Sequence, residues 1–468
     1  MLLSGYLNAQ TTTIPDSNFE QALIDLGIDS DGVINSSVLT SDVASISSLD
    51  VSGREISQLT GIEDFINLSE LYCQNNLLTS LSLSSNTKLA ILDCSENDLS
   101  SLKVTDLVEL KILRCSFNEI TGINLSSNKL LEELHCDHNL IKTLNLKDNL
   151  ELTELNCANN QFTVLTITFN WKIKYLNFSW NLFTYIDLSN NVKVEYLDCS
   201  NNPLTSIFLN NMIELQAIYM VDNDLLTEVN FSHNYKLEEI VCRDNDLLVK
   251  INLSAALALS YLDCRNNSLT ELETLYNPLL QNLYCQNNQI KTLDLSQNPN
   301  LTFLKCNDNQ LEALDLKNGS NHLMTGGITK YDGRFVYVDG MDARNNPGLL
   351  CIQVDNEQDA DLGLAPYDSW FKDESVSYSE NCDVNLGIDQ QQLNNSISIF
   401  PNPAENHIVI KADNHQIEKV VIYSILGRSV KEFDSEFETL PVKAISPGLY
   451  LLRIYTENGV SVKRFIVK

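Results

Sequence analysis

The residues best suited to chemistry stand together in the segment His135-Cys136-Asp137-His138. Imidazole, thiolate and carboxylate groups are all ligands that Zn²⁺ accepts in proteins. In an extended strand, however, successive side chains point to opposite faces, so His135 and Asp137 face outward while Cys136 faces the core. These three groups therefore cannot converge on one ion. A weaker alternative pairs His135 with His138, but we predict no metal site in this segment.

No other pattern in the sequence supports catalysis. The chain has no P-loop, no nucleophile elbow, no paired-glycine dinucleotide fingerprint and no zinc-ligand spacing. The segment Asp29-Ser30-Asp31-Gly32 resembles the start of a calcium-binding loop. It lacks the further carboxylates and the closing glutamate of an EF-hand, which favours a plain turn. We predict that the chain is not an enzyme and requires no cofactor.

The spacing of the cysteines gives more information than their number. Ten of the twelve belong to one series with a period of mostly 21 residues, and two slots of that series hold Phe178 and Met220. Such replacements would leave a disulfide partner or the other ligands of a metal site without their counterpart, whereas a buried apolar slot accepts Phe and Met as well as Cys. We therefore predict ten buried free thiols that act as small hydrophobic side chains. They are Cys73, Cys94, Cys115, Cys136, Cys157, Cys199, Cys242, Cys264, Cys285 and Cys306.

Each slot belongs to a repeat of the form L-x-x-L-x-C-x-x-N-x-L-x-x-L-x-L, and twelve such units occupy residues 68–321. A period of this length indicates a solenoid. The asparagine three places after the slot is present in every unit. Because an amide both donates and accepts hydrogen bonds, we predict a structural ladder that pairs backbone groups where each coil turns. Its members are Asn76, Asn97, Asn118, Asn139, Asn160, Asn181, Asn202, Asn223, Asn245, Asn267, Asn288 and Asn309.

This motif resembles that of the leucine-rich repeat family in its short bacterial form, with cysteine usually replacing the second strand leucine. The resemblance implies a right-handed coil whose parallel strands line a concave face that binds a partner. Independently, Leu71 and Cys73 alternate with Tyr72 and Gln74, which is the period of a strand with one buried face. We predict a β-rich solenoid.

The ends of a solenoid expose its core and require caps. We expect an N-terminal cap at residues 13–67, with a degenerate repeat and a helix that starts with a capping box, Ser17 to Glu20. Residues 322–341 interrupt the period as an insertion, and residues 342–382 form a C-terminal cap. A disulfide between Cys351 and Cys382 would staple this cap, with two free thiols as the alternative.

A change of composition follows Cys382. Residues 383–395 are interpreted as a linker, and residues 396–468 as a small antiparallel β-sandwich. This last segment resembles the C-terminal sorting domain of the type IX secretion system. The matching residues are Phe400-Pro-Asn-Pro403, Ile422-Tyr-Ser-Ile-Leu-Gly427, Pro447-Gly-Leu-Tyr-Leu-Leu-Arg453 and Lys463-Arg-Phe-Ile-Val-Lys468.

The resemblance implies export through the periplasm, recognition of residues 396–468 by the secretion machinery, and a location outside the cell or on the outer-membrane surface. The alternative for this segment is a permanent β-domain with a binding role. Residues 1–10 look like the end of a truncated signal peptide, with Ala9 before the cleavage point.

Charge narrows the range of partners. The 468 residues include 62 acidic and 31 basic side chains, for a net charge of −31. Nucleic-acid binding depends on clustered Lys and Arg, so we predict no nucleic-acid partner. No apolar run reaches the length of a transmembrane segment. Since residues 396–468 hold nine basic and eight acidic side chains, the acidity belongs to the solenoid and favours a basic or cation-bridged partner.

Aromatic residues interrupt the acidic concave face, and aromatic anchors dominate the energetics of interfaces. The predicted binding residues are Tyr175, Trp180, Tyr196, Tyr219, Tyr261 and Tyr284. We hypothesise protein–protein interaction or adhesion through this face. One alternative is a carbohydrate-binding surface protein whose rings stack on sugars. Another is a polysaccharide-degrading solenoid enzyme, which the asparagine ladder and the leucine spacing disfavour.

Overall fold

A computed structural model describes residues 10–331, 334–382, 396–412, 416–424, 429–435, 437–456 and 459–468. The chain divides into two compact units, residues 1–227 and residues 228–468. The linker predicted at residues 383–395 and most of residues 1–10, the predicted end of a signal peptide, lie outside the described residues.

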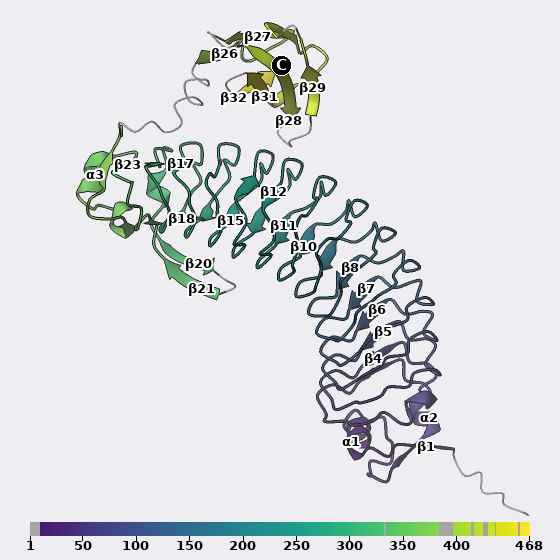
Figure 1. The fold of residues 1–468 in the computed structure, drawn as a ribbon. Helices are drawn as coiled ribbons and strands as arrows, with labels where there is room; N and C mark the ends of the chain where they lie inside the picture. The colour runs from purple at the N-terminus through teal and green to yellow at the C-terminus, as the bar shows by residue number, and fades with distance from the viewer. Residues whose placement is uncertain are drawn as a thin grey trace, which may run out of the picture. The chain divides into compact units, whose positions relative to one another are not determined.

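The first unit is a stack of short parallel strands preceded by a cap. The cap contains β1 (Thr11–Thr13) paired antiparallel with β2 (Ser37–Leu39), α1 (Ser17–Asp25), α2 (Thr40–Val43) and the 3₁₀ helix η1 (Ile62–Asp64). The parallel strands are β3 (Ser48–Asp50), β4 (Glu70–Tyr72), β5 (Ile91–Asp93), β6 (Ile112–Arg114), β7 (Glu133–His135), β8 (Glu154–Asn156), β9 (Tyr175–Asn177), β10 (Tyr196–Asp198) and β11 (Ala217–Tyr219). They pair in chain order, and Figure 1 shows β4 to β8 lying side by side.

The second unit continues the same repeat. One parallel sheet has the order β13 (Glu239–Val241), β15 (Tyr261–Asp263), β16 (Asn282–Tyr284), β18 (Phe303–Lys305), β22 (Met341–Asp342) and β24 (Trp370–Phe371). A second row of strands forms where the later coils return: β12 (Glu228–Asn230) with β14 (Lys250–Asn252), and β17 (Thr292–Asp294), β19 (Ala313–Asp315), β23 (Cys351–Gln353) and β25 (Ser377–Ser379) in one sheet. The predicted fold class, a parallel-strand solenoid of the leucine-rich repeat type, is confirmed.

The predicted insertion contains an antiparallel hairpin of β20 (Gly327–Tyr331) and β21 (Arg334–Val338), preceded by the 3₁₀ helix η2 (Asn321–Leu323). Beyond it lie α3 (Glu357–Asp361) and the 3₁₀ helix η3 (Tyr367–Ser369). Cys351 and Cys382 form a disulfide, so β23 is tied to the end of this region.

The C-terminal segment consists of two antiparallel sheets. One contains β26 (Ile397–Phe400), β27 (His407–Ala412) and β30 (Thr439–Pro441). The other has the order β29 (Ser429–Phe433), β28 (Ile417–Ser424), β31 (Gly448–Thr456) and β32 (Gly459–Val467). Buried side chains from both sheets, among them Ile408, Val420 and Leu452, form its own core. Antiparallel sheets around an apolar core agree with the expected β-sandwich.

The start of α1 differs from the prediction. The N-cap is Asp16, whose carboxylate accepts the backbone N–H of Asn18 at 3.0 Å. Glu20 is fully buried and accepts the backbone N–H of Ser36 at 2.9 Å. The predicted capping box from Ser17 was therefore wrong, because the Glu20 carboxylate accepts backbone N–H groups of residues 35–37, at the start of β2, and not one at the start of its own helix.

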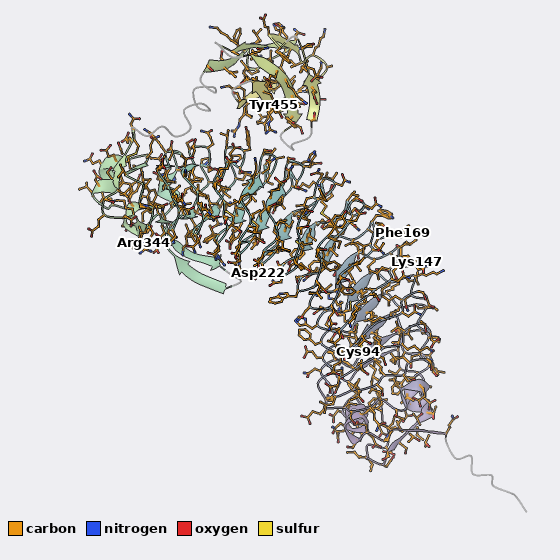
Figure 2. The ribbon with its side chains drawn as sticks, viewed as in Figure 1. Cys94, Lys147, Phe169, Asp222, Arg344 and Tyr455 are labelled. Atoms are coloured by element: carbon orange, nitrogen blue, oxygen red, sulfur yellow. A yellow bond between two sulfur atoms is a disulfide. The ribbon has the colours of Figure 1, made fainter. Side chains whose placement is uncertain are left out.

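The predicted asparagines bond backbone groups of their own and neighbouring coils. Asn139 is typical, because its Oδ1 accepts the backbone N–H of Ile120 at 2.9 Å and its Nδ2 donates to Cys115 O at 3.0 Å. The ten cysteines of the repeat are buried free thiols, and Cys94 in Figure 2 is fully buried. Burial raises the pKa of thiols such as those of Cys115 and Cys136 well above the ordinary value, which makes them unreactive core groups.

The sequence analysis missed a second asparagine ladder. Its members are fully buried, and in most of them Nδ2 donates to carbonyl oxygens 21 and 24 residues earlier. Leu107, Met212 and Ala256 occupy the same template position in three coils, so an amide is not essential there. The signal was a second asparagine with the same period. The members are Asn86, Asn128, Asn149, Asn170, Asn191, Asn234, Asn277 and Asn298.

Candidate functional site

The strand face, meaning the exposed side of the parallel strands, carries two rows of outward side chains. In β4 to β11 the middle residue of each three-residue strand is buried, and its two neighbours are partly exposed. This is the alternation expected of a strand with one face in the core. Since the strands are in register, side chains at equal template positions lie next to each other from coil to coil.

Three tyrosines of the first unit form a continuous group on this face, which we call the tyrosine stack: Tyr175, Tyr196 and Tyr219. Tyr175 and Tyr196 are directly opposite on β9 and β10, with ring centroids 4.6 Å apart and planes 9° apart. The Tyr219 ring on β11 lies 5.3 Å from that of Tyr196 at 36°. Burial raises the pKa of the Tyr175 hydroxyl above its ordinary value, so it remains a neutral hydrogen-bonding group.

Trp180 occupies a different place from these tyrosines. It lies in the turn after β9 with φ of 53°, and its side chain is 61% exposed. The residue before the ladder asparagine has positive φ in every repeat, and most such residues are Asn or Asp, which tolerate that region. The structure therefore places Trp180 at the edge of the strand face.

The same turn position in two earlier coils holds aromatic residues that are not among the predicted binding residues. Phe117 and His138 both have positive φ, and their rings stack with centroids 3.9 Å apart. The Nδ1 atom of His138 lies 2.9 Å from an Asp137 carboxylate oxygen. The signal was an aromatic side chain where the template has Asn or Asp. The predicted alternative of a His135–His138 metal pair gains no support, because His138 is engaged by Phe117 and Asp137.

The two predicted tyrosines of the second unit are less accessible. Tyr284 on β16 is fully buried, so its prediction as an exposed binding residue was wrong. It lies in register between Asp263 and Lys305, and its ring centroid is 5.6 Å from that of the partly buried Tyr261. The Asp263 carboxylate, which is also buried, contacts an Arg265 guanidinium at 3.1 Å. A position that the template alone marks as outward is therefore buried in this coil.

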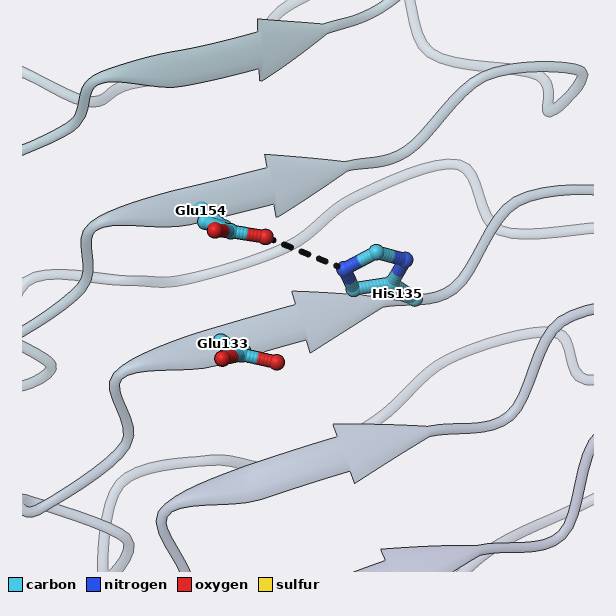
Figure 3. A group of neighbouring side chains, drawn as sticks. All are labelled: Glu133, His135 and Glu154. Atoms are coloured by element: carbon cyan, nitrogen blue, oxygen red, sulfur yellow. Dashed lines mark ion pairs between the residues drawn. The ribbon is translucent and has the colours of Figure 1, made fainter.

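A group of ionisable side chains lies on β7 and β8, shown in Figure 3. One ligand atom from each of Glu133, His135 and Glu154 lies within 4.8 Å of the other two. His135 Nε2 is 3.7 Å from a Glu154 carboxylate oxygen, and Arg114 contacts Glu133 at 2.9 Å. Cys136 points into the core, as predicted from the alternation. Each glutamate is an outward acidic residue three positions before its cysteine, in consecutive repeats, and the repeat pattern alone did not indicate that the two meet His135.

These features define a class of protein: a repeat solenoid that presents a strand face, joined to a separate antiparallel β-domain. Residues 398–468 match the family model described as the secretion system C-terminal sorting domain. No curated protein matches the sequence. Among the described residues, none of the helices is both long and apolar enough to cross a membrane.

Several solved structures are similar to this chain. An internalin of Listeria monocytogenes is similar with a TM-score of 0.57 and 20% identity over 64% of this chain and 91% of that chain. A leucine-rich repeat protein of Leptospira interrogans gives a TM-score of 0.50 and 23% identity over 58% and 81%. The functional domain of InlJ from Listeria monocytogenes, described as including a cysteine ladder, gives 0.49 and 22% over 98% and 99%.

The chain therefore has a solenoid of the leucine-rich repeat fold, and its residues 398–468 match the secretion system C-terminal sorting domain. That domain indicates secretion to the cell surface or beyond.

Proposed function

We propose that this secreted protein holds a protein partner on the strand face of residues 1–227, with the tyrosine stack at the centre of the interface, and that this interaction serves adhesion. The observation that carries the proposal is the stack itself. Three large aromatic side chains lie in contact on three successive strands that pair in register, and all three are partly exposed. Aromatic residues clustered at the centre of a surface are the usual hot spots of protein interfaces.

The charges around the stack favour a partner with basic groups. Glu154 is in register with Tyr175, and Asp198 is in register with Tyr219. A Lys or Arg of the partner could pair with these carboxylates and lie against the tyrosine rings. The net charge of −31 would also speed the encounter with a basic surface.

The geometry of the rings makes a sugar ligand the weaker alternative. Sugars stack on the open face of an aromatic ring. The nearly parallel Tyr175 and Tyr196 rings, with planes 9° apart and centroids 4.6 Å apart, cover one face of each other. A protein side chain can instead pack against ring edges and the hydroxyl groups, which remain available in such an arrangement.

Binding by the wild-type chain and by a variant without the tyrosine stack tests the proposal. Partners captured from cell-surface extracts are identified, and their affinity is measured by biolayer interferometry against the wild type and the triple variant Y175A/Y196A/Y219A. Removing a hot spot costs at least about 2 kcal/mol, so we expect a loss of binding of more than about thirtyfold. The separate variant W180A shows whether the edge of the strand face takes part.

The matched control is Y185A, since Tyr185 is an exposed tyrosine of the same unit that lies off the strands and packs against Phe208. It should bind as the wild type does. Equal binding by the triple variant and the wild type would move the interface away from the tyrosine stack. Binding on a glycan array that the triple variant loses would favour the carbohydrate alternative.

A further inference from the structure

The Glu133, His135 and Glu154 group places like charges in direct opposition. Glu133 and Glu154 are register partners on β7 and β8, and like charges directly opposite each other in a sheet repel. Arg114 contacts Glu133 at 2.9 Å. Glu154 lies 3.7 Å from His135, whose ring is charged only when it is protonated. The group therefore has an unbalanced negative charge whenever His135 is neutral.

The histidine supplies a second, independent observation. His135 Nε2 is buried and has no hydrogen-bond partner among the residues that the structure describes. Buried polar atoms are nearly always paired, and one that is not paired calls for an explanation such as an ion. Nε2 of a neutral imidazole is also a common metal-binding atom of proteins. In Figure 3 this atom is directed toward the carboxylate of Glu154 on the neighbouring strand.

We propose that Glu133, His135 and Glu154 bind a divalent transition-metal ion, with Zn²⁺ as the best match. One imidazole nitrogen and two carboxylate oxygens form a ligand set that Zn²⁺ accepts, whereas Ca²⁺ and Mg²⁺ prefer oxygen ligands alone. Ligand atoms around a tetrahedral zinc ion lie about 3.3 Å apart, so the present separations of up to 4.8 Å require the side chains to close by up to about 1.5 Å.

Three protein ligands leave one position of a tetrahedral ion open. All three side chains are partly exposed on the strand face, so this position faces outward, where water or a group from another molecule can occupy it. The site belongs to the chain itself and does not depend on the proposed function of the tyrosine stack.

Zinc titration of the full chain, freed of metal with a chelator, tests the site. Isothermal titration calorimetry should show one zinc ion per wild-type chain. H135A and E154Q should each weaken this binding by more than about tenfold, because even the outer-shell partners of metal ligands are worth 10- to 100-fold. Circular dichroism of each variant verifies that it is folded.

Two further measurements separate this site from other sources of zinc affinity. The Co²⁺-loaded protein should lack the strong near-ultraviolet absorption of thiolate ligation, because the ten cysteines of the repeat are buried away from the site. R114Q should bind zinc more tightly than the wild type, since it removes the cation that competes for Glu133.

The control H233A alters an exposed histidine outside the site and should bind zinc as the wild type does. The proposal is overturned if the wild type binds no zinc, or if folded H135A and E154Q bind it with unchanged affinity.

Discussion

The first asparagine ladder allows a quantitative prediction at Asn139. Its Oδ1 accepts the backbone N–H of Ile120 at 2.9 Å, and its Nδ2 donates to Cys115 O at 3.0 Å and Cys136 O at 3.2 Å. Asn139 and Ile120 are both buried. The substitution Asn139→Ala removes all of these bonds and introduces no new polar group.

The cost of this substitution follows from which groups retain a partner. Cys115 O keeps a bond from Asn118 Nδ2 at 3.1 Å, and Cys136 O keeps one from Asn160 Nδ2 at 3.0 Å. The N–H of Ile120 loses its acceptor in a site that water does not reach. A buried donor without a partner costs about 1–3 kcal/mol, so Asn139→Ala should lower the free energy of unfolding by about that amount.

The matched control lies in the second ladder at Asn128, which is also fully buried. Its Nδ2 donates to Val104 O and Leu107 O, but these oxygens also accept backbone N–H groups at 3.0 and 3.2 Å. Its Oδ1 has no partner among the described residues. Asn128→Ala deletes the same atoms but orphans no backbone donor, so it should cost about 1 kcal/mol or less beyond the shared cavity cost.

Urea unfolding and hydrogen exchange together measure these effects. Repeat arrays can unfold in parts, so the exchange rate of the peptide that contains Ile120 provides the local reading and the urea midpoint the global one. Asn139→Asp should cost more than Asn139→Ala, because a buried carboxylate would face carbonyl oxygens. Equal losses for Asn139→Ala and Asn128→Ala, or unchanged protection of Ile120 in Asn139→Ala, would refute the reasoning.

Two further predictions concern the second unit. Burial raises the pKa of the Asp315 carboxyl to about 6. Between about pH 4 and pH 6 the folded state therefore binds more protons than the unfolded state, and the free energy of unfolding falls as pH rises through that window. The free energy of unfolding of Asp315→Asn minus that of the wild type should therefore be about 2 kcal/mol larger at pH 7.5 than at pH 4.5. If urea unfolding gives the same difference at both pH values, the prediction is wrong. Loss of the Cys351–Cys382 disulfide, which spans 31 residues, should cost about 3–4 kcal/mol in the chain-entropy model. The double variant C351A/C382A tests this by urea unfolding and by protease cleavage within residues 342–382, and unchanged cleavage would show that the bridge does not hold this region.

The fold could be predicted because the spacing of the repeated residues is visible in the sequence itself. A slot that holds Cys, Phe178 or Met220 indicates burial without any knowledge of the three-dimensional structure, and alternation around the slot predicts which neighbours face outward. The capping box failed for a different reason. Glu20 has the spacing that the motif requires. Its carboxylate instead accepts the backbone N–H groups of Asn35 and Ser36, which lie outside the helix.

The candidate sites could be predicted only in part. Tyr175, Tyr196 and Tyr219 belong to outward template positions, and the structure adds that their rings are in contact. Tyr284 occupies an outward position as well but is buried. The exposure of an outward residue depends on what packs around it in the tertiary structure, and a template that treats each coil alone does not contain that information.

The sequence by itself determined the solenoid, the ladder of asparagines, the buried thiols and the separate sorting domain. These depend on local periodicity, because each coil repeats the same contacts with its nearest neighbours. The tertiary structure alone decided which outward side chains meet across strands, as Glu133 and His135 meet Glu154 from the next coil. Residues about 20 positions apart come within a few ångströms only when the coils are stacked in register, and the chemistry of the strand face arises from that stacking.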